Sequence, residues 1–66
     1  MPRSTREWAR RELEASVKNI DWSGSHLYAV IEKYESEHPQ VSEPLVAILK
    51  VFEECQTMIN LVRSSF

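Results

Sequence analysis

The C-terminal third of the chain decides the fold: residues 45–66 read LVAILKVFEECQTMINLVRSSF. Apolar residues in this stretch step alternately by three and four positions, as the a and d positions of a packed helix do. They are Leu45, Ile48, Phe52, Cys55, Ile59, Val62 and Phe66. The pattern predicts one long helix over about residues 43–65, with Ser42 as its N-cap and Pro44 in the first turn.

The positions that flank this a/d series are mostly apolar as well, among them Leu49, Val51 and Met58. Charged residues occupy such positions in a two-stranded coiled coil, so this helix needs neighbours on more than one side. We expect a homo-oligomeric helical bundle in which a second copy packs antiparallel to this helix. A monomeric three-helix bundle is the alternative. The predicted oligomer interface consists of Leu45, Ile48, Phe52, Cys55, Met58, Ile59, Val62 and Phe66.

Two shorter helices are predicted upstream, over about residues 5–19 and 24–37. Ser4 and Glu7 have the spacing of a capping box, which leaves residues 1–4 as a flexible arm. The dipeptide His38-Pro39 ends the second of these helices, because proline disfavours helical backbone at the residue before it.

A break is expected between these two helices, at residues 19–25, because Asn, Asp, Ser and Gly favour non-helical backbone there. Ser23 is the best N-cap after the break, with Trp22 and Leu27 at the spacing of a hydrophobic staple. The chain is therefore predicted to be a single all-α domain of three helices, covering residues 1–66.

Composition supports this fold class and limits what the chain can be. One glycine and three prolines in 66 residues are too few for the tight turns of a β fold. No apolar run approaches the ~18 residues of a transmembrane helix, so we expect no membrane partner. A chain this short buries little surface and has one cysteine, so oligomerisation is its expected source of stability. The lone cysteine and the lack of a signal peptide predict a cytoplasmic protein.

No constellation of residues predicts catalysis. Cys55 falls at a d position of the predicted packed face, where a cysteine behaves as a small hydrophobe. His26 and His38 are far apart in sequence, and the chain has too few Cys and His residues for a structural zinc site. Phosphate-binding and nucleotide-binding motifs are absent from the sequence. We therefore expect a protein that is not an enzyme and needs no metal or cofactor.

Three aromatic residues lie off the main apolar stripes and predict a binding role. They are Trp8, Trp22 and Tyr28. Exposed aromatic side chains of this kind are enriched at the energetic centres of protein interfaces. The favoured hypothesis is a small regulatory or adaptor protein that docks on a larger protein.

An arginine cluster supports two alternatives. Arg3, Arg6 and Arg10 follow the i, i+3, i+7 spacing of one helix face, with Arg11 beside them. Residues 1–20 carry five basic and three acidic side chains, so the cluster could contact nucleic acid. In the further alternative, the chain sequesters a small anionic ligand with these arginines. Backbone N–H groups near Ser23 and Ser25, at the start of the predicted second helix, would assist.

Overall fold

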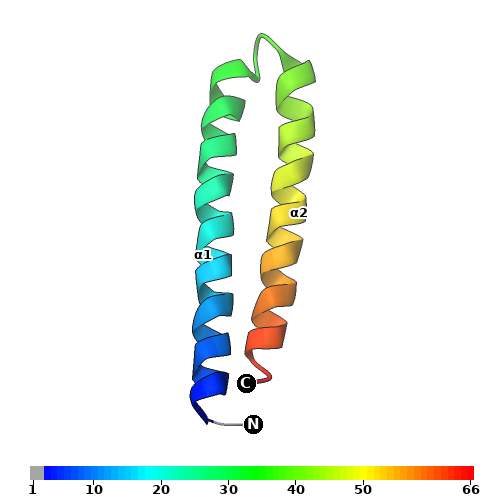
Figure 1. The fold of residues 1–66 in the computed structure, drawn as a ribbon. Helices are drawn as coiled ribbons and strands as arrows, with labels where there is room; N and C mark the ends of the chain where they lie inside the picture. The colour runs from blue at the N-terminus through cyan, green and yellow to red at the C-terminus, as the bar shows by residue number, and fades with distance from the viewer. Residues whose placement is uncertain (1–2) are drawn as a thin grey trace.

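The computed structural model describes the backbone of residues 3–66 and the side chains of residues 5–66. Two helices account for most of it: α1, Arg3–Tyr34, and α2, Pro39–Arg63. They lie side by side and antiparallel, joined at one end by residues 35–38, with the C-terminus beside the start of α1 at the other end (Figure 1). The hairpin is a rod with principal extents of 54 × 15 × 10 Å. The prediction of an all-α fold is confirmed.

The prediction of three helices is wrong, because α1 continues through residues 19–25 without a break. Gly24 packs against α2 there: a Cβ atom on it would lie 3.4 Å from Leu49 Cδ2. The Ser25 hydroxyl donates to the Asp21 carbonyl oxygen at 3.1 Å, so it bonds within α1 and does not cap a new helix. Packing against α2 thus overrides the weak local preference of these residues for non-helical backbone.

The caps predicted around this break are also wrong. Ser23 lies inside α1 and is not an N-cap. Trp22 is exposed whereas Leu27 is half-buried, so the predicted staple between them does not form.

The ends of the helices differ from the predictions by a few residues. α1 includes residues 3 and 4, which we expected in an arm, and residues 1 and 2 lie outside the described part of the chain. α2 begins at Pro39, four residues before the predicted start, because proline suits the first helical position. Ser42 is therefore inside α2 and buried, and its hydroxyl donates to the Pro39 carbonyl oxygen at 3.4 Å.

The two helices pack along one seam that contains little fully buried apolar surface. Among the described residues, Ile31 is the one buried hydrophobic residue, at 4% exposure. The seam of α2 consists of its buried and half-buried positions, together with Phe66 just beyond its end: Ser42, Leu45, Leu49, Phe52, Gln56, Ile59, Arg63 and Phe66. The half-buried and buried positions of α1 include Ala9, Leu13, Val17, Ile20, Gly24, Leu27 and Ile31.

Only every second position of the predicted a/d series lies in this seam. Leu45, Phe52, Ile59 and Phe66 do so, but Leu49, Gln56 and Arg63 occupy the seam positions predicted for Ile48, Cys55 and Val62. Cys55 is exposed in the single chain, so it does not pack against α1. Polar bonds to α1 place Gln56 in the seam: its amide donates to the Val17 carbonyl oxygen at 3.0 Å and to Asp21 Oδ1 at 2.7 Å.

Replacing Gly24 tests how closely α2 approaches α1 at this glycine. Gly24→Ala should raise the free energy of unfolding by about 1 kcal/mol, because alanine favours helix. Its methyl group would meet Leu49 and Phe52 at ordinary contact distances of 3.4 and 3.9 Å. Urea unfolding followed by circular dichroism gives the value. As a control, Ala29→Gly, at an exposed position of α1, should lower the free energy of unfolding by a similar amount. A Gly24→Ala variant that is less stable than the native chain would contradict the described contact distances.

Candidate interaction surfaces

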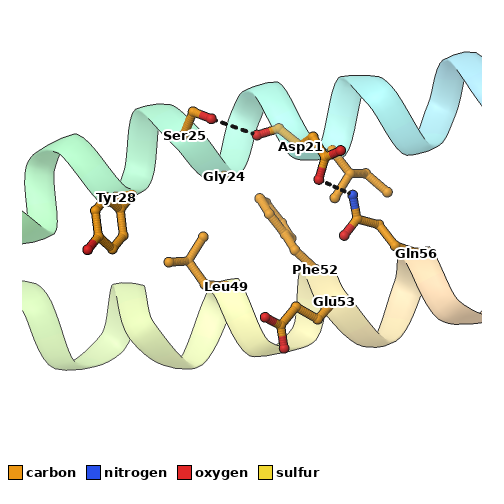
Figure 2. Close-up of a pocket in the computed structure, with 9 residues that line it drawn as sticks. Asp21, Gly24, Ser25, Tyr28, Leu49, Phe52, Glu53 and Gln56 are labelled. Carbon is orange, nitrogen blue, oxygen red and sulfur yellow. Dashed lines mark hydrogen bonds between the residues drawn. The ribbon is translucent and has the colours of Figure 1, made fainter.

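A shallow groove opens along one side of the seam, near the middle of the hairpin. Its volume is about 390 Å³, and Gly24 lies in its wall. Figure 2 shows Leu49 and Phe52 extending from α2 towards Gly24, with Gln56 bonded to Asp21 beside them. Ser25, also in the wall, is bonded within α1. Asp21, Ser25 and Gln56 in this wall are therefore already bonded within the chain.

A second hollow, nearer the start of α1, brings together two basic residues that are distant in sequence. Arg10 of α1 and Arg63 of α2 both line it. Arg63 lies 3.7 Å from the Glu14 carboxylate and donates to Asn60 Oδ1 at 3.1 Å. Arg10 donates to the backbone oxygen of Phe66. Both guanidinium groups are therefore engaged within the chain.

Sequence reasoning missed Arg63, because a single arginine in an apolar helix carries no signal of its own. Glu14 also forms an i,i+4 ion pair with Lys18, at a distance of 3.4 Å. Glu14 thus contacts a cation on each helix.

The arginines and serines that were predicted to hold an anion are not assembled into one site. Arg6, Arg10 and Arg11 are exposed, and the Arg3 side chain lies outside the described residues. Ser23 and Ser25 lie in the interior of α1, so the helix start on which that hypothesis depended does not exist. Fifteen residues of helix separate Ser25 from Arg10, which is about 22 Å at 1.5 Å per residue.

The aromatic residues predicted to bind a partner are exposed and divide into two groups. Trp8 and Trp22 are 60% and 69% exposed, and their spacing of fourteen residues places them on one side of α1. The rings of Trp22 and His26 are 5.2 Å apart between centroids, so these side chains form one small cluster. Tyr28 is also exposed, but it lines the groove and belongs to a different side of α1.

A second exposed apolar surface follows α2. Its residues step by three and four positions, are all exposed, and line neither the groove nor the second hollow. We call this surface the α2 stripe; it consists of Ile48, Val51, Cys55, Met58 and Val62. Four of its members belong to the predicted oligomer interface. The other four residues of that prediction pack against α1 within the chain.

Comparisons with other proteins add no further site. No protein family, curated protein or solved structure matches the chain.

In the part of the chain that the structure describes, no three His, Cys, Asp or Glu side chains cluster as metal ligands would. Over the same residues, neither helix combines the length and the apolar character that crossing a bilayer requires.

Gln56 joins the two helices across the seam, and its removal should loosen the hairpin. We expect Gln56→Ala to lower the free energy of unfolding by about 1–2 kcal/mol, because one neutral hydrogen bond is lost and the bond to Asp21 is exposed, so water partly replaces it. Chemical denaturation at a fixed protein concentration measures the change. The neighbouring Thr57, which donates only to the Glu53 carbonyl oxygen, gives a matched control in Thr57→Ala. Equal stability of the two variants would contradict a joining role for Gln56.

Proposed function

We propose that the chain is a small non-catalytic regulatory or adaptor protein that binds a larger protein through one face of α1. The observation that carries this proposal is the exposure of Trp8 and Trp22, 60% and 69%, on a single side of the helix. Ala15 and Ala29 repeat at the same seven-residue spacing and are also exposed. We call these four positions the tryptophan face.

The tryptophan face has the chemistry of a protein-binding surface. A buried tryptophan adds a large apolar area with few rotatable bonds, and its indole N–H offers one directed hydrogen bond. The small side chains of Ala15, between the two tryptophans, and Ala29, seven residues beyond Trp22, leave room for a partner's side chains. The two rings lie about 21 Å apart along α1 at 1.5 Å per residue, which matches the contact length of a helix or groove on a larger protein.

We propose further that the working form is a homo-oligomer in which α2 contacts another copy. The seam alone leaves the chain with one buried hydrophobic residue, Ile31, among those described. Chains of this size usually need a disulfide, a metal or a partner for independent stability. The α2 stripe is the apolar surface that self-association would cover, and the tryptophan face lies on the other helix.

Removing the two tryptophans tests partner binding. Trp8→Ala combined with Trp22→Ala should abolish capture of a protein partner from the cells that express this chain, read by mass spectrometry of the bound fraction. The free energy of unfolding should change by less than about 0.5 kcal/mol, because both side chains are exposed. The helix content should stay the same. Glu12→Gln with Glu32→Gln, both exposed on α1, is the matched control and should retain the partner. A melted double-tryptophan variant, or unchanged capture, would count against the proposal.

Nucleic-acid binding by the arginines is the competing function, and a titration separates it. We expect no binding of double- or single-stranded DNA or RNA at ~50 mM salt, where phosphate contacts are strongest. The chain has a net charge of −2, and Arg10 and Arg63 are engaged within it. Tight binding that weakens steeply as salt rises would favour the competing function.

A further inference from the structure

The hairpin exposes more surface than a compact chain of its mass. Its accessible surface is 5284 Å², whereas a compact monomer of 7.7 kDa exposes about 4,300 Å², a difference of about 1,000 Å². A stable protein–protein interface of standard size covers about 800 Å² on each partner. The surplus is therefore large enough to supply what one copy contributes to a dimer.

The α2 stripe is the surface that fits such a contact. Ile48, Val51 and Met58 are 40%, 54% and 67% exposed, and no charged residue lies on the stripe between residues 48 and 62. The groove, with Glu53 in its wall, opens on the other flank of α2. On the same side of the hairpin as the stripe, α1 carries Ser16, Ser23 and Val30 at seven-residue spacing, and such short side chains permit close approach.

We infer that two copies pair through the α2 stripe, antiparallel, with the two-fold axis at Cys55. This inference rests on the proposed homo-oligomer and specifies its interface. Cys55 is the middle residue of the stripe, with Ile48 seven residues before it and Val62 seven after. A two-fold axis there places Ile48 of one copy opposite Val62 of the other, and Cys55 opposite its own copy.

The length of the hairpin places the axis at the same residue. α1 spans residues 3–34, so its midpoint falls between residues 18 and 19. Gln56 bonds to Val17 and Asp21 and is therefore level with that midpoint. Because Cys55 adjoins Gln56, an axis at Cys55 makes the two rods overlap along their whole length and so bury the most surface.

Antiparallel pairing also covers the open end of each copy. Arg63, the last residue of α2, is level with Glu14, so α1 extends past α2 at its N-terminal end (Figure 1). In the antiparallel dimer the partner copy's interhelical loop lies beside this end, whereas a parallel dimer would place the two protruding ends beside each other. The opposed helix dipoles of the two α2 helices add a small favourable contribution.

Engineered cysteines test the pairing directly. In a Cys55→Ser background, Ile48→Cys and Val62→Cys variants are prepared separately and treated with a thiol oxidant, which takes two electrons and two protons from each thiol pair. The antiparallel dimer predicts a covalent dimer in the mixture of the two variants and little in either alone. Disulfide formation within a single-variant sample would indicate parallel pairing and overturn the inference. The native chain should cross-link at Cys55.

A charge placed on the stripe gives the complementary test. Val51→Glu should reduce the mass in sedimentation equilibrium from twice 7.7 kDa to that of one chain. Val46→Glu is the matched control, because Val46 is equally exposed (53% against 54%) but lies off the stripe; it should remain a dimer. A native chain that stays monomeric at all concentrations, or equal dissociation of the two variants, overturns the inference. Partner capture through Trp8 and Trp22 is measured separately, so its failure is not confused with this one.

Discussion

Each helix of a two-helix hairpin has only one neighbour, and this constraint governs the whole molecule. A helix can press one side against its partner, so apolar residues elsewhere on its surface remain in water. α1 packs one apolar side in the seam and exposes Trp8 and Trp22, and α2 packs one apolar side in the seam and exposes the α2 stripe. No element of the described chain therefore covers the α2 stripe.

The sequence predicted the helical class, the position of the long C-terminal helix and the turn near Pro39. It failed at residues 19–25, because local preferences of Asn, Asp, Ser and Gly cost only a few tenths to about 1 kcal/mol each in a helix. Contacts distant in sequence outweigh such amounts: Gly24 lies against Leu49, and Asp21 bonds to Gln56. Those contacts exist only once α2 is in place, so no window of local sequence could show them.

The prediction of which α2 residues pack together was wrong at three positions for a related reason. A prediction from periodicity selects the more apolar of two adjacent positions. It therefore selects Cys55 over Gln56 and Val62 over Arg63. Gln56 lies in the seam because its amide reaches acceptors on α1, and Arg63 because its guanidinium lies near Glu14. Long polar side chains pack with their carbon stems and bond at their tips. The exposure of Trp8, in contrast, was predictable, because Trp8 lies off the apolar stripe of the first helix.

The two exposed surfaces lie on different helices and differ in chemistry, which separates assembly from recognition. The α2 stripe is formed by aliphatic side chains, a methionine and a cysteine, residues that suit a dry contact between identical helices. The tryptophan face has large rings, a nearby histidine and exposed polar neighbours, which suits a mixed contact with a different protein. In a dimer that uses the stripe, the tryptophan face of α1 stays exposed on each copy. The assembled molecule then presents two tryptophan faces, and two linked weak contacts bind more tightly than either alone when a partner can engage both.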